Sequence, residues 1–238
     1  MPCDQRPHKR NHSPESYFMI VTLDGPAGAG KSTIARQLAD RLGFAFLDTG
    51  AMYRSVTLVA VRNQGPWDDP QSLAELASHC QIEMDGSRVY LNGEDVSELI
   101  RLHEVTSHIH YLADNSAVRE RMVALQRGFA EGQDIVTEGR DQGTIAFPNA
   151  ECKIFLTASP EERARRRVQE LRARGQQITV DEVLAQQNER DHRDSTREVG
   201  RLEPATDAIV VCTDGMSPDQ VIERLVEIVR ERTMRADG

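Results

Sequence analysis

The sequence FMIVTLDGPAGAGKS, at residues 18–32, joins an almost continuous apolar run to a glycine-rich turn. An apolar run of this kind is typical of a strand buried on both faces in a parallel sheet. Residues 25–32 match G-x-x-x-x-G-K-[ST], a pattern in which main-chain N–H groups surround a phosphate at the start of a helix. The stretch therefore predicts a strand, a phosphate-binding loop and a helix.

The phosphate-binding loop carries side chains suited to a nucleotide. Its glycines allow backbone conformations and close approaches that other residues would prevent. Lys31 is placed to reach the β- and γ-phosphates, and Ser32 to ligate Mg²⁺. A chance glycine-rich turn is the alternative, but the buried strand before the loop and the helical pattern after it favour the functional reading. The residues expected at the nucleotide are Gly25, Pro26, Ala27, Gly28, Ala29, Gly30, Lys31, Ser32 and Thr33.

Strands and helices alternate along most of the chain. Helical patterns and apolar strand patterns follow one another, as is typical of a mostly parallel sheet with helices on both faces. We expect strands at 18–24, 44–48, 134–139, 152–158 and 208–213, and helices at 31–42, 51–62, 160–173, 179–195 and from Pro218. Between about 80 and 97 the sequence CQIEMDGSRVYLNGEDV predicts short antiparallel strands, and helices occupy much of 98–131. This patch indicates a subdomain inserted into the α/β alternation.

Composition narrows the possible functions. A chain of 238 residues with 39% hydrophobic and 28% charged residues can form one substantial core. A net charge of −9 argues against a protein that binds duplex nucleic acid. The four cysteines form no CxxC pair, so disulfides and zinc are not expected and a reducing cytoplasm fits. No apolar run is long enough to span a membrane. Residues 1–17 are polar, so we expect a disordered tail there.

The run RDHRDSTR, at residues 190–197, is the other notable feature. The helical stripe of Val180, Val183, Leu184 and Gln187 continues in phase into this run. Arg190, Asp194 and Arg197 would then share one inward face. Because burying unpaired charge is costly, these groups must pair with one another or meet a polar ligand. A solvated helix face is the alternative.

The phosphate-binding loop alone leaves several classes of protein open: a GTPase switch, an ATPase motor or a small-molecule kinase. The sequence contains no Asn-Lys pair, and hence no N-K-x-D signature of guanine recognition. A kinase for a small acceptor needs further groups, namely cations for the acceptor's anion and polar side chains for its ring.

Several separate segments supply such groups. They read LDGPAGAGKST, LDTGAMYR, LNGEDVSELIR, EGRDQGTIAFPNAECKIFLTASPEERARRR and RDHRDSTR…PATDAIVV, in this order. With these motifs the chain resembles the bacterial cytidylate kinase family over essentially all of residues 18–232. The resemblance implies a P-loop nucleoside monophosphate kinase fold: a parallel sheet flanked by helices, an inserted subdomain with a small antiparallel sheet, and a lid.

The resemblance also implies roles for individual residues. The loop at 25–33 would bind ATP, with Mg²⁺ on Ser32. In the acceptor site, Arg54, Arg140 and Arg197 would hold the phosphate of CMP, and together with Lys31 they would be the catalytic residues. The nucleoside would be contacted by Thr49, His110, Arg119, Asp141, Arg190 and Asp194. Asp141 would accept from the exocyclic amine of cytosine, which uracil lacks.

Some positions leave alternatives open. His110 stands where the family has a small serine, so use of UMP stays open. Asp191, His192 and Arg193 are expected to be ordinary solvated charges. The segment 159–177 would form the lid over ATP. The resemblance does not distinguish which of Arg163, Arg165, Arg166 and Arg167 reaches phosphate.

The resemblance predicts one domain at 18–234, with the acceptor-binding insert at about 50–132 and the lid at about 159–196. It implies transfer of the γ-phosphoryl group of ATP to CMP or dCMP by a monomeric cytoplasmic enzyme that needs Mg²⁺. The alternatives are a P-loop kinase acting on UMP, AMP or shikimate, a nucleotide-binding switch without turnover, and a nucleic-acid-binding protein.

Overall fold

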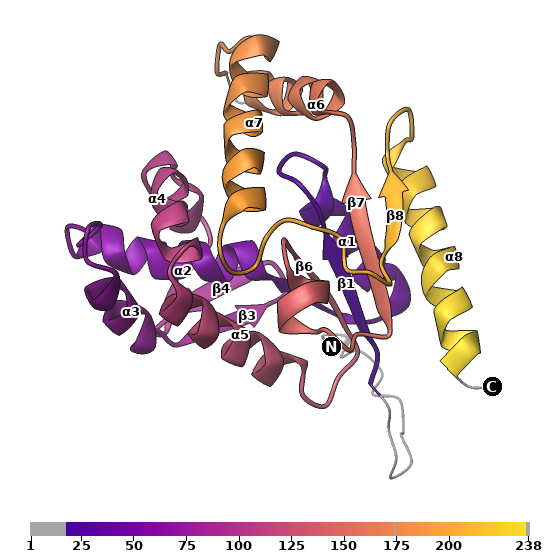
Figure 1. The fold of residues 1–238 in the computed structure, drawn as a ribbon, viewed down its shortest axis with the longest axis horizontal. Coiled ribbons are helices and arrows are strands. Elements are labelled where there is room, and N and C mark those ends of the chain that lie inside the picture. Colours follow the sequence, from indigo (N-terminus) through magenta and orange to yellow (C-terminus); the bar gives the residue numbers. More distant parts are fainter. Residues whose placement is uncertain (1–17, 174, 237–238) are drawn as a thin grey trace, which may run out of the picture.

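A computed structural model describes residues 18–173 and 175–236, and the expected tail at 1–17 lies outside this range. Its centre is a five-stranded sheet in the order β2-β6-β1-β7-β8, in which every pairing is parallel (Figure 1). The strands are β1 (Ile20–Asp24), β2 (Ala45–Asp48), β6 (Ile135–Gly139), β7 (Cys152–Thr157) and β8 (Ile209–Cys212). The predicted parallel sheet is confirmed, with all five strands within two residues of the expected positions.

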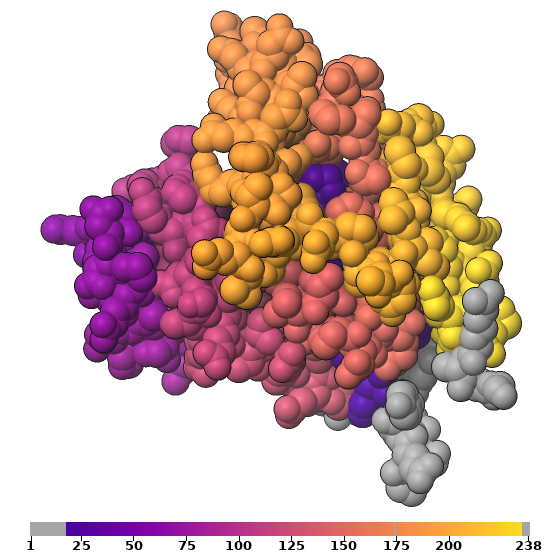
Figure 2. Space-filling view, in the orientation of Figure 1, coloured from indigo at the N-terminus to yellow at the C-terminus, as the bar shows by residue number. Residues whose placement is uncertain are grey.

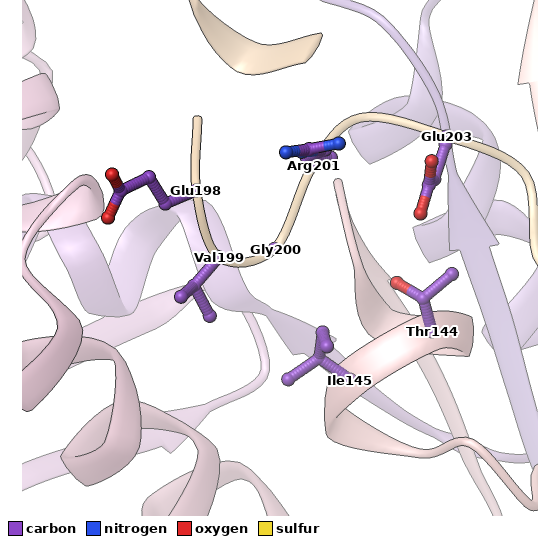
Figure 3. Close-up of a pocket in the computed structure, with 7 residues that line it drawn as sticks. All are labelled: Thr144, Ile145, Glu198, Val199, Gly200, Arg201 and Glu203. Carbon is purple, nitrogen blue, oxygen red and sulfur yellow. The ribbon is translucent and has the colours of Figure 1, made fainter. Parts of the chain in front are cut away.

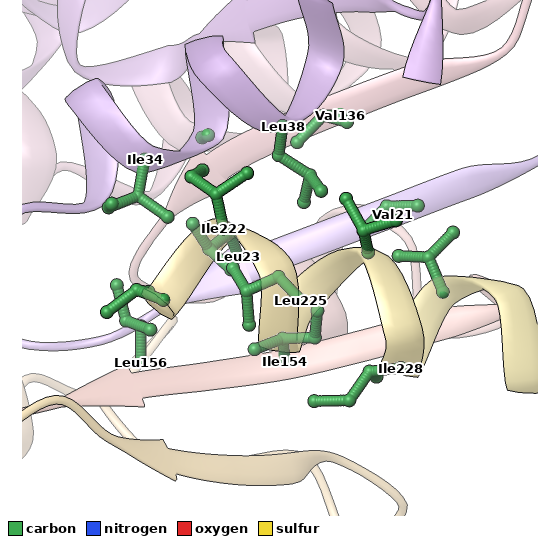
Figure 4. Packing of buried hydrophobic residues seen from close by; sticks show 14 of the residues in the cluster. Val21, Leu23, Ile34, Leu38, Val136, Ile154, Leu156, Ile222, Leu225 and Ile228 are labelled. Atoms are coloured by element: carbon green, nitrogen blue, oxygen red, sulfur yellow. The ribbon is translucent and has the colours of Figure 1, made fainter. Parts of the chain in front are cut away.

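Two helices cover one face of the sheet and form the main core. α1 (Lys31–Leu42) begins inside the phosphate-binding loop, and α8 (Pro218–Ala236) packs beside it. In Figure 4, Leu225 and Ile228 of α8 face β1 and β7, where Leu23 is fully buried. Burial of apolar side chains on this scale is the main force that fixes α1, and with it the end of the loop, on the sheet.

A second cluster of buried apolar residues includes Leu47 of β2 and otherwise belongs to the elements at the left of Figure 1. It joins α2 (Thr49–Arg62), α3 (Pro70–Ser78), η1 (Leu99–Arg101), α4 (His103–Ala113) and α5 (Ser116–Ala130). The small antiparallel sheet of β3 (Ile82–Asp85), β4 (Arg88–Leu91) and β5 (Glu94–Asp95) belongs to the same cluster. The antiparallel patch predicted at about 80–97 is therefore confirmed.

Helix α3 was not predicted, because the sequence GPWDDP before it suggested only a break. In the structure Asp69 is its N-cap and accepts from the N–H groups of Gln71 and Ser72, with Pro70 in the first turn. A proline tolerates this position because its missing N–H would have no helical partner there. The break in the pattern is thus also a helix start.

Two helices, α6 (Pro160–Ala173) and α7 (Val180–Thr196), stand at the top of Figure 1, above the arrowhead of β7. They pack on each other through Ala164, Val168 and Val183. A capping box between Thr179 and Glu182 starts α7. We call this pair the α6–α7 hairpin. Figure 2 shows indigo atoms, the colour of β1 and the loop after it, at the bottom of a hollow beneath the hairpin.

Candidate active site

The phosphate-binding loop lies between β1 and α1. Gly25, Gly28 and Gly30 all have positive φ angles, of 150°, 78° and 80°. A Cβ at Gly25 would collide with the carbonyl oxygen of Leu156, so the close approach of the loop to β7 requires glycine there. These angles match the role that the sequence pattern predicts for the glycines.

Lys31 is buried at the first position of α1, and its Nζ donates to the carbonyl oxygen of Pro26 at 2.7 Å. Burial first, and then the positive charge of Arg140, lower the pKa of Lys31 to about 7. The hydrogen-bond acceptor of Lys31 is neutral, and the negative charges of Glu138 and Asp24 only partly oppose this lowering of its pKa. A phosphate group would add a further negative charge beside the ammonium.

Two carboxylates lie beside the loop at the carboxyl ends of the parallel strands. Asp24 accepts from the main-chain N–H groups of Gln142 and Gly143 at 2.9 and 2.7 Å, and burial raises its pKa to about 7. Glu138 accepts from the hydroxyl of Ser32 at 2.7 Å, and burial followed by the charge of Asp48 raises its pKa. Sequence analysis assigned neither carboxylate a role.

These oxygen donors fit a magnesium ion that is shared with a nucleotide. Among residues 18–173 and 175–236, no group of three or more His, Cys, Asp or Glu side chains could hold a metal. Mg²⁺ commonly takes one or two protein oxygens and completes its octahedron with water and phosphate. Ser32 with Asp24 or Glu138 offers such a partial set.

The arginines predicted to bind the acceptor phosphate come from three elements, and each is paired with a carboxylate. Arg140, after β6, donates to Asp194 of α7 at 2.9 Å. Arg197, at the end of α7, pairs with Asp194 and also with Asp114 at 3.2 Å. Burial would raise the pKa of Asp194, but the charges of Arg140 and Arg197 outweigh it and the pKa is lowered. The inward charged face predicted for α7 is thus present at Asp194.

The third of these arginines lies further along the same edge. Arg54 of α2 pairs with Asp48 at 3.4 Å, and Asp48 also caps α2 by accepting from the N–H of Ala51. Asp48 ends β2 next to Glu138 of β6 in the parallel register. The structure therefore gathers Arg54, Arg140 and the phosphate-binding loop at the carboxyl ends of β1, β2 and β6, where open α/β sheets bind ligands.

The two residues expected to read the base form a buried ion pair. Arg119 of α5 donates to Asp141, and both side chains are less than a tenth exposed. Burial raises the pKa of Asp141, although the charges of Arg119 and Arg197 oppose this effect. Gly200, with φ of 70°, crosses directly over the pair, and a Cβ there would collide with both partners. Sequence analysis assigned no role to this glycine.

Three further predicted residues lie around this edge. The hydroxyl of Thr49 donates to the carbonyl oxygen of Glu138 at 2.7 Å. His110 of α4 is half-buried, and burial followed by the charge of Arg193 lowers its pKa. The positive charge of Arg190, in α7, acts on Lys31, and the charge of Arg140 acts on both of these residues.

The four arginines predicted to lie in the lid have different partners in the α6–α7 hairpin. Arg163 is buried and donates to the carbonyl oxygen of Ala27 in the phosphate-binding loop at 2.8 Å. Arg165 and Arg166 pair with Glu162, and Arg167 pairs with Glu170. Of these four described residues, only Arg163 donates a hydrogen bond to the loop, and the sequence could not distinguish it from the others.

The prediction that Asp191 is an ordinary solvated charge is wrong. Its carboxylate pairs with Arg163 at 2.6 Å and accepts from the N–H of Ala27 at 3.3 Å. Asp191 lies four residues after Gln187, so it extends the inward stripe of α7. Arg193 pairs with Glu189 in the same helix, as expected of a surface charge.

An open pocket of about 290 Å³ lies on the outer side of the segment that contains Gly200. Figure 3 shows Thr144 and Ile145 opposite Glu198, Val199, Arg201 and Glu203. Ile145 and Val199 are 38% and 46% exposed, so the lining is shallow. No residue of the phosphate-binding loop lines the pocket, and the pocket borders the Arg119–Asp141 pair through Gly200.

Comparison with known proteins fits this geometry. Residues 21–231 match the family model of cytidylate kinase. The chain belongs to the cytidylate kinase family. A cytidylate kinase from Rhodopirellula baltica is 60% identical over 213 residues, which cover 90% of this chain and 93% of that protein. A cytidylate kinase from Caldanaerobacter subterraneus is 44% identical over 90% of this chain and 95% of its own length.

A third relative joins the family to a second activity. A bifunctional pantoate ligase/cytidylate kinase from Trichormus variabilis is 46% identical over 90% of this chain, and the match covers 41% of that longer protein. The cytidylate kinase family thus includes both separate chains and parts of a fusion. None of the described helices is long and apolar enough to cross a membrane.

Proposed function

We propose that this member of the cytidylate kinase family transfers the γ-phosphoryl group of ATP to CMP or dCMP, giving ADP and CDP or dCDP. The observation that carries the proposal is the row of arginines beside the phosphate-binding loop. Arg54, Arg140 and Arg197 are each oriented by a carboxylate from the protein. A nucleotide-binding switch would need only the loop and would leave these arginines without a role.

On the donor side, the main-chain N–H groups of the loop and Lys31 would bind the phosphates of ATP. Ser32 with Asp24 or Glu138 would hold Mg²⁺, which when bound neutralises phosphate charge. Phosphoryl transfer asks for positioning and charge stabilisation more than for covalent chemistry. Arg163 adds a buried cation next to the loop.

On the acceptor side, Arg54, Arg140 and Arg197 would bind the phosphate of CMP and orient one of its oxygens towards the donor. That oxygen is already an anion at neutral pH, so no general base is required. The ribose would lie against Arg190, Asp194 and Thr49. Asp141, held by Arg119, would accept from the amine of cytosine, and His110 would lie near the base.

Several wider expectations belong to the same proposal. The segment at about 50–132 would bind the acceptor, and the α6–α7 hairpin, within about 159–196, would act as the lid that keeps water from the transferring group. A monomer in the cytoplasm stays a prediction.

The test is ADP formation in the presence of ATP and Mg²⁺ with CMP, dCMP, UMP, AMP and shikimate offered in turn. CMP and dCMP should stimulate ADP formation most strongly. Stimulation by UMP as large as that by CMP would show that Asp141 and His110 do not select the base. If no pyrimidine monophosphate stimulated the reaction, the proposal would fail.

A further inference from the structure

The α6–α7 hairpin holds the phosphate-binding loop through Ala27. One oxygen of Asp191 accepts from the N–H of Ala27 at 3.3 Å, and the other pairs with Arg163 at 2.6 Å. The same guanidinium donates to the carbonyl oxygen of Ala27 at 2.8 Å. The ion pair therefore binds both main-chain polar groups of a single loop residue.

This contact is packed and is not an isolated surface pair. The side chain of Arg163 is 5% exposed, and its Nε also donates to the carbonyl oxygen of Ala158 at 3.2 Å. Gln187 lies against Gly28 and donates to the carbonyl oxygen of Arg163 at 3.4 Å. Because Arg163 is fixed by main-chain acceptors on two sides, Asp191 is held at the loop.

The carboxylate of Asp191 lies where a phosphate oxygen could bind. Main-chain N–H groups of such a loop are donors for phosphate oxygens, and a buried arginine is a preferred partner of phosphate. Asp191 offers both groups a negatively charged oxygen, the same chemistry that a phosphate would offer. A nucleotide phosphate that approached Ala27 would meet a like charge and would have to displace it.

We propose that Asp191 is an internal anion that takes the place of a phosphate oxygen at Ala27 and Arg163, and that it sets the affinity of the loop for ATP. This inference rests on the proposed function only in taking ATP as the ligand of the loop. Asp191 acts through Arg163 and the main chain, so it is a positioning residue. Binding of ATP exchanges the carboxylate for a phosphate oxygen and transfers Arg163 from one anion to the other.

The exchange predicts a gain of affinity when the charge is removed. Asp191→Asn keeps the size of the side chain but gives the nucleotide a neutral competitor. We expect the Kd for the non-hydrolysable analogue β,γ-imido-ATP, measured by titration calorimetry with Mg²⁺, to fall roughly threefold to tenfold, the net worth of one ordinary hydrogen bond. A residue with only a structural role would, on loss, weaken binding or leave it unchanged.

Glu189→Gln is the matched control, because Glu189 is a carboxylate of the same helix that pairs only with Arg193. Its Kd should stay within about twofold of the unsubstituted protein, which separates the local effect from a change of net charge. Asp191→Ser gives the same test if the Asn variant does not fold. An unchanged or larger Kd in the folded Asp191 variant would overturn the inference.

Thermal melts give a second readout. Without nucleotide, Asp191→Asn should melt at a lower temperature than the unsubstituted protein because the ion pair is lost. Saturating analogue should raise the melting temperature of the variant by more than it raises that of the unsubstituted protein. An equal rise in both proteins would contradict the exchange. The proposed function fails separately, through absent ADP formation with nucleoside monophosphates, while analogue binding can still be measured.

Discussion

Lys31 on the donor side and the arginines on the acceptor side of this site hold their positive charges differently. Lys31 donates to the carbonyl oxygen of Pro26, a neutral group in its own loop. Arg140 and Arg197 on the acceptor side are instead paired with Asp194, a carboxylate from α7. The hydrogen-bond partner of Lys31 is therefore neutral, whereas a carboxylate orients the two arginines before a ligand binds.

This difference affects how each side should respond to substitution. Substitution of Lys31 removes a charge that does not stabilise the fold. Removing a carboxylate from the acceptor side leaves buried arginines without a partner, which costs stability as well as binding. Chemistry and stability should therefore separate at Lys31 and be linked at the arginines of the acceptor side.

The largest effect should come from Lys31→Ala. We expect kcat to fall by at least about a hundredfold, as when a preorganised donor to a developing charge is lost. The fold should survive, because the side chain of Lys31 donates its hydrogen bond to its own loop. Steady-state ADP formation and a circular dichroism melt check both parts. Turnover close to that of the unsubstituted protein would show that Lys31 has another role.

Asp194→Ala should come next, with its effect on the acceptor. We expect kcat/KM for CMP to fall by roughly tenfold to a hundredfold, since Arg140 and Arg197 lose their common partner. The affinity for β,γ-imido-ATP should change by less than about threefold. The free energy of unfolding should also fall by about 3 kcal/mol or more, the cost of breaking a buried pair.

The control for Asp194→Ala is again Glu189→Gln, which removes a carboxylate of α7 that does not contact the site. Equal losses for CMP and for the ATP analogue in the Asp194 variant would contradict the division into two sides.

Asp141→Asn should act on selectivity. An amide oxygen accepts less strongly than a carboxylate, and the amide can turn its NH₂ group towards the carbonyl of uracil. We expect the ratio of kcat/KM for CMP to that for UMP to fall by about tenfold. Measurement of both substrates in the same preparation cancels differences in the folded fraction. A ratio that did not change would remove Asp141 from base recognition.

The pH dependence of stability should show the state of Lys31 directly. Its pKa is about 7 in the folded protein against 10.5 for an unperturbed lysine, so between these values the unfolded chain binds more protons. The free energy of unfolding should therefore rise with pH from about 7 to 10, by at most about 1.4 kcal/mol per pH unit from this group.

Lys31→Met should flatten that rise in denaturant titrations at several pH values. Lys153→Met is the matched control, because Lys153 is also buried but is paired with Asp207 and lies outside the site. Its variant should lose stability by a similar amount at each pH. A slope that survives in Lys31→Met would mean that other groups produce it.

The two sides also differ in how well the sequence predicts them. The loop at 25–32 is contiguous, so its pattern alone predicts its backbone, its lysine and its place after a buried strand. The helical phase of α7 predicts an inward charge at Asp194, and the inserted antiparallel strands follow from their turns. These features depend on local geometry, which the sequence specifies directly.

The contacts between elements could not be predicted in the same way. Asp114 and Glu138 act through neighbours that only the sheet order and the packing of α4 and α7 bring close. Asp191 continues the stripe of Gln187, but its partner is the loop, and that contact depends on where the α6–α7 hairpin packs. Helix α3 was missed for a local reason, since Asp69 and Pro70 serve as a helix start within what reads as a break.

The central claim is that phosphate leaves ATP for a cytidine monophosphate held by Arg54, Arg140 and Arg197, and not for water. Phosphorus NMR of the protein with ATP, Mg²⁺ and CMP tests it most directly. The account predicts that the β-phosphate resonance of CDP grows as the γ-phosphate resonance of ATP declines, in equal amounts. Formation of ADP and inorganic phosphate without CDP would contradict it.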